Sequence, residues 1–277
     1  MEKPIRWVAN LSLLFTELPL LERPAAAMAA GFDEMECWWP FGAQARPRQS
    51  DVDAFVRAVE VSGIALTAMN LFGGDPASRS RGILSYPECS ADFRDSVDVA
   101  MGIARRLGVK LFNAPYGDRR AGLSHPEQDS LAVENLAYAA NAAVDGGGVI
   151  MVEPLSGDGA YPVKTSAEAV AILDRAAGAA GATNLGLLFD VFHLTRNGAD
   201  VGADIALFAH RVVHVQLADA APGRGEPGSG SADLTGAVSG ILATGYEGAF
   251  ALEYVPSTTT EESLRAWWRE LDSWGLG

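Results

Sequence analysis

Short apolar runs alternate with helically spaced segments along the whole chain. The runs are rich in β-branched and aromatic residues, and they predict buried strands at residues 5–9, 34–38, 64–69, 109–113, 149–153, 185–190, 212–216 and 249–253. The segments between them predict helices at residues 20–30, 52–62, 91–107, 127–145, 166–179, 202–209, 234–243 and 261–274. Glycine follows several of these segments, for example Gly63 and Gly108, as is typical of helix C-termini. The pattern therefore consists of eight βα units in succession.

The strands indicate how these units are arranged. They are apolar throughout rather than alternating, which favours a parallel sheet covered by helices. Eight such units in 277 residues predict a single α/β domain over residues 1–277, a closed (β/α)8 or TIM barrel. A doubly wound open sheet is the alternative, but no GxGxxG motif follows the first strand.

Composition and charge narrow the classes of function. No stretch reaches the roughly 18 uninterrupted apolar residues of a membrane helix. Asn10 and Ser12 interrupt the N-terminal apolar stretch, so we interpret it as a strand rather than a signal peptide and expect a cytoplasmic protein. The formal net charge of −14 argues against a nucleic-acid partner. Trp267 and Trp268 are consistent with a subunit contact in a homo-oligomer, although core packing is the favoured interpretation.

Four successive strands end in polar residues: Glu153, Asp190, Gln216 and Glu253. Their spacings of 37, 26 and 37 residues each correspond to about one βα unit, so the side chains should converge at one end of the barrel. Crowded carboxylates repel unless a cation compensates them. Because all the ligands would be oxygens, Mg²⁺ or Mn²⁺ is favoured over zinc. The alternative for each carboxylate alone is helix capping or pairing with Arg or Lys.

Further candidate residues lie beside this cluster. His193 follows the sixth strand, and His214 shares a strand face with the seventh strand end, so both are candidates for substrate binding. A packing role for His214 is equally compatible with the sequence. The loop after the seventh strand carries Arg224 and Glu226 and is a candidate substrate clamp, although its glycines and prolines are also explained as turn residues.

Together these stretches resemble the hydroxypyruvate isomerase family of the xylose isomerase-like barrels, over nearly the whole chain. The matching stretches are residues 10–17, 31–36, 152–154, 189–193, 214–219, 222–224, 226–230 and 252–254. The resemblance implies a metal bound by Glu153, Asp190, Gln216 and Glu253. It also implies that the two glutamates act as an acid–base pair and that His193 and Arg224 contact the substrate.

Two loops depart from the family pattern. The family usually has His between the Arg and Glu of its Gly-Arg-His-Glu-Pro loop, where this chain has Gly225. After the fifth strand the family tends to read Asn-x-x-Asp-Met-Pro-Gly-Tyr, whereas residues 156–161 read Ser-Gly-Asp-Gly-Ala-Tyr. The catalytic residues match the family pattern. Because both altered loops are expected to line the pocket, the identity of the substrate is left open.

The expected function is a metal-dependent aldose–ketose isomerase acting on a small sugar acid. Hydroxypyruvate, with tartronate semialdehyde as its product, and 2-oxo-tetronates are the candidate substrates. The metal would stabilise an enediolate, the two glutamates would move the proton, and Arg224 would bind the carboxylate. A ketose 3-epimerase with the same residues and a non-catalytic sugar-binding barrel are the alternatives. A metal-dependent endonuclease is disfavoured, because it requires more histidine ligands than four histidines supply, and a basic groove.

Overall fold

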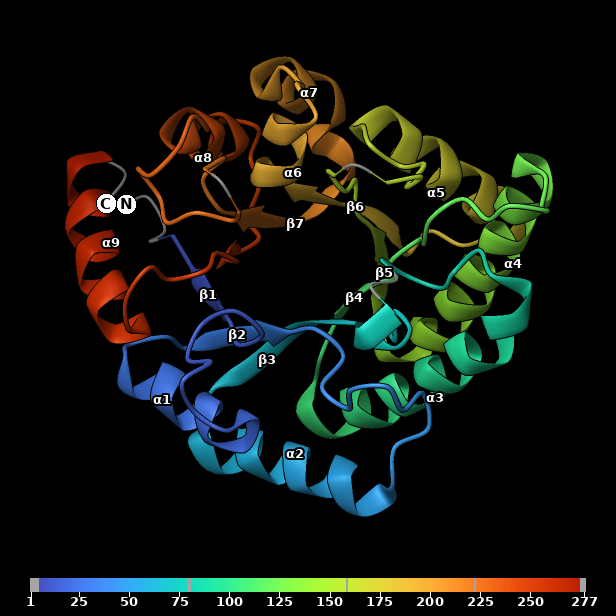
Figure 1. Cartoon of the computed structure of the whole chain (residues 1–277), viewed down its shortest axis with the longest axis horizontal. Coiled ribbons are helices and arrows are strands. Elements are labelled where there is room, and N and C mark those ends of the chain that lie inside the picture. The colour runs from blue at the N-terminus through green and yellow to red at the C-terminus, as the bar shows by residue number, and fades with distance from the viewer. Residues whose placement is uncertain (1–4, 79–80, 158, 222, 275–277) are drawn as a thin grey trace.

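The computed structural model describes residues 5–78, 81–157, 159–221 and 223–274, and in these it shows a ring of strands enclosed by helices (Figure 1). The strands are β1 (Trp7–Asn10), β2 (Glu34–Cys37), β3 (Ala65–Asn70), β4 (Leu111–Asn113), β5 (Val149–Val152), β6 (Leu185–Asp190), β7 (Val212–Leu217) and β8 (Phe250–Leu252). The α-helices are α1 (Arg23–Ala29), α2 (Gln49–Ser62), α3 (Ser90–Leu107), α4 (His125–Ala143), α5 (Ser166–Ala180), α6 (Val191–Arg196), α7 (Val201–Phe208), α8 (Leu234–Ala243) and α9 (Thr260–Trp274). Short 3-10 helices are η1 (Leu20–Glu22), η2 (Pro76–Ser78), η3 (Pro87–Cys89), η4 (Val144–Gly146) and η5 (Ala209–Arg211). Asp158 and Pro222, which belong to the two loops discussed above, lie outside the described residues.

Every strand pairs in parallel with its neighbours in sequence, and β8 pairs with β1 to close the ring. The predicted (β/α)8 barrel is therefore confirmed. The region after β6 differs from the prediction, because two helices, α6 and α7, replace the single helix expected at residues 202–209. The shorter one, α6, begins directly at the strand end, where the Asp190 side chain accepts a hydrogen bond from the His193 backbone N–H.

Local sequence signals explain where several helices begin and end. Ser124 and Thr165 form capping boxes with the glutamates three residues later, at the starts of α4 and α5. Gly63 and Gly108 end α2 and α3 with positive φ angles of 76° and 78°, a conformation that glycine adopts without steric cost. None of the described helices is both long and apolar enough to cross a bilayer.

The last helix, α9, packs its tryptophans into the core. Trp267 is 2% exposed, and its ring meets Trp7 edge-on at 5.4 Å between centroids. Trp268 lies against Phe32 at 5.5 Å. These contacts agree with the core-packing interpretation of the two tryptophans.

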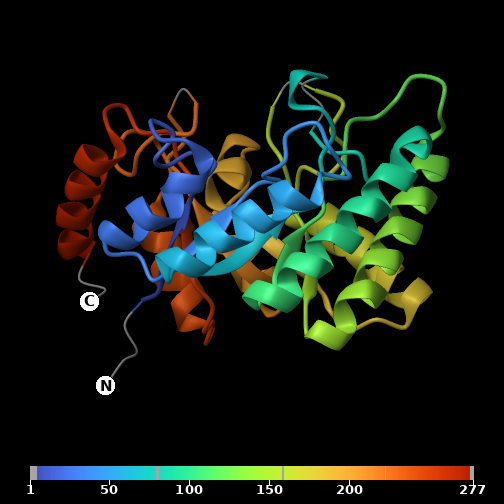
Figure 2. The ribbon, with the colours of Figure 1, turned by 90° about the horizontal axis from the view of Figure 1, so that it is seen from below.

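Polar residues mark the carboxyl ends of the strands. The loops that follow the strands rise on this same side of the barrel, at the top of Figure 2. Ladder partners bring neighbouring strand ends to one level: Asn10 pairs with Glu36, and Asp190 pairs with Gln216. The polar residues at the carboxyl ends of the eight strands, or one position away from them, are Asn10, Glu36, Asn70, Asn113, Glu153, Asp190, Gln216 and Glu253. The barrel therefore gathers a ring of carboxyl and amide groups at the bases of its longest loops.

Candidate active site

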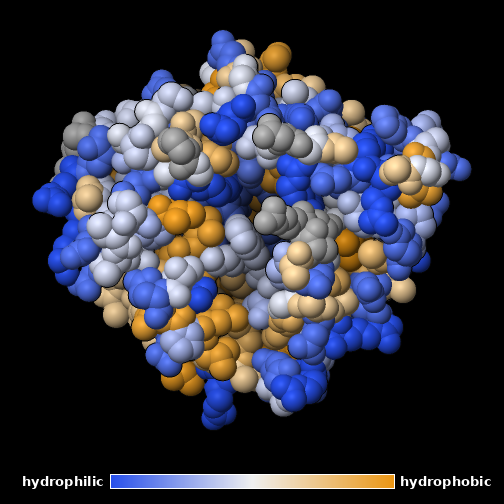
Figure 3. Space-filling model, viewed as in Figure 1, coloured by the Kyte–Doolittle hydropathy of each residue, from blue (hydrophilic) through white to orange (hydrophobic). Residues whose placement is uncertain are grey.

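A cavity of about 450 Å³ opens on this face of the barrel. Figure 3 shows the same face, hollowed near its middle. Of the residues predicted from the sequence, Glu153, His193, Arg224 and Glu253 line it, whereas Asp190, Gln216, His214 and Glu226 lie outside its lining. The rest of the wall includes the aromatic rings of Trp38 and Trp39, the apolar residues Leu71, Pro76, Pro115 and Leu155, and a second guanidinium, Arg81.

Arg224 contacts two of the predicted metal ligands. Its Nη2 forms an ion pair with Asp190 Oδ2, and its Nη1 donates to Glu253 Oε2 at 2.7 Å. The guanidinium also lies over the Phe192 ring, 4.9 Å from its centroid. Arg224 therefore neutralises part of the carboxylate cluster, which is the pairing with Arg that the sequence left open as the alternative for each carboxylate.

Burial and neighbouring charges shift the pKa values of the three carboxyl groups. Burial raises the pKa of Glu153 well above its usual value, and the neighbouring Glu253 and Asp190 add to this effect. Burial likewise raises the pKa of Glu253, to about 8, although Arg224 opposes the shift. Burial also disfavours the ionised form of Asp190, but Arg224 and His193 outweigh it and lower the pKa of that group. Asp190 is therefore the carboxylate that Arg224 keeps ionised, while the two glutamates tend to hold their protons.

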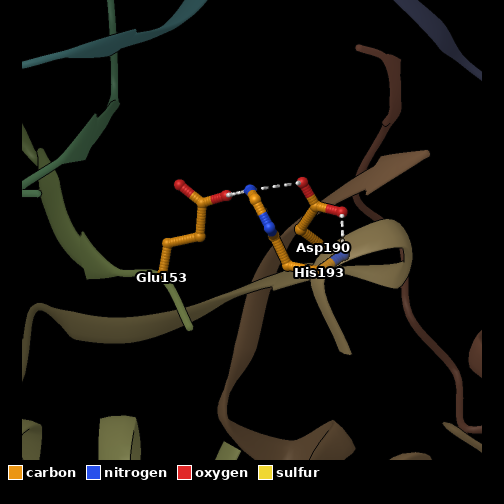
Figure 4. Close-up of side chains that lie close together, drawn as sticks. All are labelled: Glu153, Asp190 and His193. Atoms are coloured by element: carbon orange, nitrogen blue, oxygen red, sulfur yellow. Dashed lines mark hydrogen bonds and ion pairs between the residues drawn. The ribbon is translucent and has the colours of Figure 1, made fainter. Parts of the chain in front are cut away.

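His193 lies between Glu153 and Asp190 (Figure 4). Its Nδ1 accepts a hydrogen bond from the Ser156 backbone N–H at 2.9 Å. Burial lowers the pKa of His193 to about 4, so the ring is neutral near pH 7. A neutral ring that accepts at Nδ1 carries its proton on Nε2, which lies 3.7 Å from Glu153 Oε1 and 3.9 Å from Asp190 Oδ2. His193 thus presents an N–H donor at the site.

The donors at this site fit a hard divalent cation. Among the described residues, the side-chain oxygen Oε1 of Gln216 is buried and has no hydrogen-bond partner. Glu153, Asp190 and His193 bring one potential ligand atom each to within 4.8 Å of one another. Because the Nε2 proton of His193 prevents that nitrogen from ligating a metal, the available ligands are oxygens, which Mg²⁺ and Mn²⁺ prefer. Glu253 lies close to these residues, because Arg224 forms ion pairs with both Asp190 and Glu253.

Two residues predicted to contact substrate lie elsewhere. His214 is 1% exposed and pairs with Glu36, one layer inside the barrel and away from the cavity lining. Glu226 also lies outside the lining, and its carboxylate accepts hydrogen bonds from the backbone N–H and the hydroxyl of Ser257, at 3.0 and 2.8 Å. Their positions therefore support structural roles for both residues in place of the predicted substrate contacts.

Several residues that hold the site were missed in the sequence. Asn113 donates to Glu153 Oε2 at 2.7 Å, and Trp38 Nε1 donates to Glu253 Oε1 at 2.7 Å. Asn10 and Glu36 belong to the same network beneath Glu253. Asn10 and Asn113 do have a sequence signal, a polar residue at the end of an apolar run, because each ends a strand just as Asp190 does.

A family model described as "Xylose isomerase-like TIM barrel" matches residues 24–271. A Streptomyces coelicolor protein named "Putative hydroxypyruvate isomerase" is 44% identical over 95% of this chain and 95% of its own length. The Escherichia coli protein named "Hydroxypyruvate isomerase" is 32% identical over 94% of this chain and 97% of its own length. The chain belongs to the hydroxypyruvate isomerase family of xylose isomerase-like TIM barrels. A crystal structure described as "AP endonuclease, family 2" from Brucella melitensis has a TM-score of 0.85 at 29% identity and covers 96% of this chain and 98% of that chain.

Membership of the hydroxypyruvate isomerase family confirms the resemblance seen in the sequence and the assignment of the chain as an isomerase. The two departures from the family pattern both touch the site. Ser156, which begins the altered loop after β5, provides the N–H that orients His193. Gly225 lies in the β7–α8 loop next to Arg224, and its backbone exchanges hydrogen bonds with Asp219 in both directions.

The altered loop at Gly225 leaves no space for a side chain. A Cβ atom at this position would lie 2.3 Å from Ser229 Oγ and 2.7 Å from Ala221 Cβ. We therefore expect Gly225→Ala to lower the free energy of unfolding by roughly 1–3 kcal/mol, measured by urea denaturation, because the loop must shift to relieve the overlap. Gly178→Ala in α5 is the matched control, since its Cβ would meet no atom within 4 Å and alanine is the better helix former. Equal stability of the Gly225→Ala and wild-type proteins would contradict the close packing of this loop.

The raised pKa values predict a pH-dependent stability of the metal-stripped protein. In the folded protein the pKa of Glu253 is raised from 4.5 to about 8, so between these values the folded state holds a proton that the unfolded state has released. Raising the pH through this window therefore favours unfolding, by up to roughly 1.4 kcal/mol per pH unit. In urea melts with a chelator present, wild type should lose stability relative to Glu253→Gln between about pH 5 and pH 8. Parallel curves for the two proteins would show that Glu253 ionises normally.

Proposed function

We propose that the protein is a metal-dependent aldose–ketose isomerase that acts on a small hydroxy-oxo acid, of the hydroxypyruvate and tartronate semialdehyde type or the 2-oxo-tetronate type. The observation that carries this proposal is the pair of buried glutamates, Glu153 after β5 and Glu253 after β8, which line one cavity together. Isomerisation between adjacent carbons requires a proton to leave one carbon and another to reach its neighbour. Two carboxyl groups facing the same cavity can share these tasks.

A divalent cation, Mg²⁺ or Mn²⁺, is the proposed cofactor. Glu153, Asp190, Gln216 and Glu253 would hold it, because they supply three carboxylates and a buried amide oxygen, Gln216 Oε1, that lacks a hydrogen-bond partner. When bound, the cation supplies Lewis-acid polarisation of the substrate carbonyl and of the adjacent hydroxyl group.

The side chains around the cavity then account for the proton movements. One glutamate takes the proton from the hydroxyl-bearing carbon, and the other gives a proton to the neighbouring carbonyl carbon, while the hydroxyl proton passes to the former carbonyl oxygen. The Nε2–H of His193, fixed by the Ser156 backbone, donates a hydrogen bond to a substrate oxygen. The apolar and aromatic residues of the wall would lie against the substrate and reduce its contact with water.

With a divalent cation bound to balance the carboxylates, the cavity would suit an acidic substrate. Two guanidinium groups, Arg224 and Arg81, line it. Arg81 is held by Asp118 Oδ1 at 2.6 Å and by the Ser156 carbonyl oxygen at 3.1 Å, and it lies over the Tyr161 ring. Planar guanidinium groups bind carboxylates in a fixed geometry, so this wall suits a substrate that carries a carboxylate. The similarity to hydroxypyruvate isomerases supports the same class of substrate.

The direct test is isomerisation in deuterated water. Metal-stripped protein supplied with Mg²⁺ or Mn²⁺ should convert hydroxypyruvate to tartronate semialdehyde, and proton NMR should show deuterium entering the product. Conversion that proceeds equally with a chelator would contradict the metal requirement. Inactivity with hydroxypyruvate and 2-oxo-tetronates, together with exchange or epimerisation of ketoses, would instead identify a ketose 3-epimerase. Binding of sugars without any turnover would identify a binding protein.

The two-glutamate mechanism predicts the behaviour of the amide variants. Glu153→Gln and Glu253→Gln each remove one proton carrier but keep the size of the side chain, so both proteins should fold. We expect turnover to fall by roughly 10²–10⁴-fold in each, measured as kcat. Glu60→Gln, an exposed glutamate of α2, is the control and should keep wild-type turnover. Wild-type activity in either active-site variant would contradict the mechanism.

A further inference from the structure

Glu36, in β2, is a buried carboxyl group that the proposed proton movements do not use. It is 2% exposed and lies beneath the cavity, between the ends of β1 and β7. We propose that Glu36 is a positioning residue, which fixes the Gln216 amide with its oxygen toward the metal site and holds Glu253 in place through Asn10. This inference rests on the proposed metal site.

The contacts of Glu36 connect it to two of the four proposed metal ligands. Its Oε1 accepts hydrogen bonds from Gln216 Nε2 and Asn10 Nδ2, both at 2.7 Å. The same Asn10 nitrogen also donates to Glu253 Oε1 at 3.0 Å. On the other side, Glu36 Oε2 meets His214 Nε2 at 2.5 Å, so both carboxyl oxygens are held and the group cannot rotate without breaking contacts.

The chemistry of a carboxylate determines which way the Gln216 amide faces. Glu36 Oε1 is an acceptor, since Asn10 Nδ2 also donates to it, so Gln216 turns its NH₂ group toward Glu36. Its oxygen, Oε1, then faces away from Glu36, and it is one of the buried side-chain oxygens that have no hydrogen-bond partner among the described residues. Asn10 is fixed in the same way, because its own oxygen accepts from the Ser12 backbone N–H at 3.0 Å and its NH₂ group bridges Glu36 and Glu253.

A glutamine at position 36 would remove this constraint. An amide can both donate and accept, so Glu36→Gln allows Gln216 to present either its oxygen or its NH₂ group to the metal site. An NH₂ group cannot ligate a cation. We therefore expect the affinity for Mn²⁺ to fall by roughly 10- to 100-fold, as is typical when a group that orients a metal ligand is lost.

The experiment measures Mn²⁺ binding to the metal-stripped full chain by titration calorimetry and by the EPR signal of free Mn²⁺, without substrate. Glu34→Gln is the matched control, because Glu34 lies in the same strand but pairs with Arg6 at the other end of the barrel. We expect Glu34→Gln to bind Mn²⁺ as wild type does and Glu36→Gln to bind it roughly 10- to 100-fold more weakly. If Glu36→Gln does not fold, Glu36→Asp replaces it, since this variant keeps a carboxyl group in the buried site but shortens the side chain and so withdraws it from Gln216.

A double-variant cycle separates positioning from a general structural effect. Gln216→Glu offers a carboxylate whose two oxygens are equivalent, so it needs no orientation, and the amide introduced by Glu36→Gln could donate to it. In the Glu36→Gln background this change should raise Mn²⁺ affinity at least roughly tenfold more than it does in wild type, where it would place two carboxylates side by side. The same effect in both backgrounds would overturn the positioning role.

The outcomes distinguish the two proposals. Absence of Mn²⁺ binding by the wild-type protein would contradict the metal site itself. Tight binding by wild type together with equally tight binding by Glu36→Gln would leave the metal site standing and would reject the role of Glu36.

Discussion

The site depends on the burial of three carboxyl groups at neighbouring strand ends. Glu153, Asp190 and Glu253 are each buried, at 7%, 1% and 3% exposure, and like charges removed from water repel strongly. Within the described structure, Arg224 is the cation that contacts two of them, Asp190 and Glu253, and its single charge keeps Asp190 ionised while the pKa values of both glutamates stay raised. The site is therefore short of positive charge, and a divalent cation is the addition that would allow all three groups to ionise together. This electrostatic requirement links the fold to the proposed chemistry.

The barrel meets that requirement through strand register rather than through loop conformation. Asp190 and Gln216 are ladder partners, as are Asn10 and Glu36, so the backbone itself places these side chains at one level. Glu36, which contacts His214 deeper in the barrel, lies beneath the proposed ligands. The loops supply the more variable parts: Ser156 orients His193, and the loop around Gly225 carries Arg224. The strands thus position the proposed ligands, and the loops complete the wall of the cavity.

The strands and the four proposed ligands could be predicted because each signal is local. Apolar runs mark buried strands, and a polar residue at the end of a run marks the catalytic face of a barrel. Asn10 was missed because the first run was ended at residue 9, and Glu36 because the second run was extended to residue 38, which makes Glu36 an interior strand residue. Helix α6 is too short to show a helical period, so the position of His193 on its first turn was not foreseen. His214 was assigned to the correct strand face, but alternation gives no depth along the barrel axis. Glu226 accepts a hydrogen bond from Ser257, 31 residues away, and no local sequence pattern predicts such a contact.

The ring of strand-end carboxyl and amide oxygens is the proposed cation site. Anomalous diffraction from crystals soaked in Mn²⁺ would locate the ion without reference to activity. We expect one strong peak within bonding distance of oxygens from Glu153, Asp190, Gln216 and Glu253, with Arg224 displaced from at least one carboxylate. A peak bound through His193 Nε2, or strong Mn²⁺ peaks confined to other parts of the molecule, would contradict it.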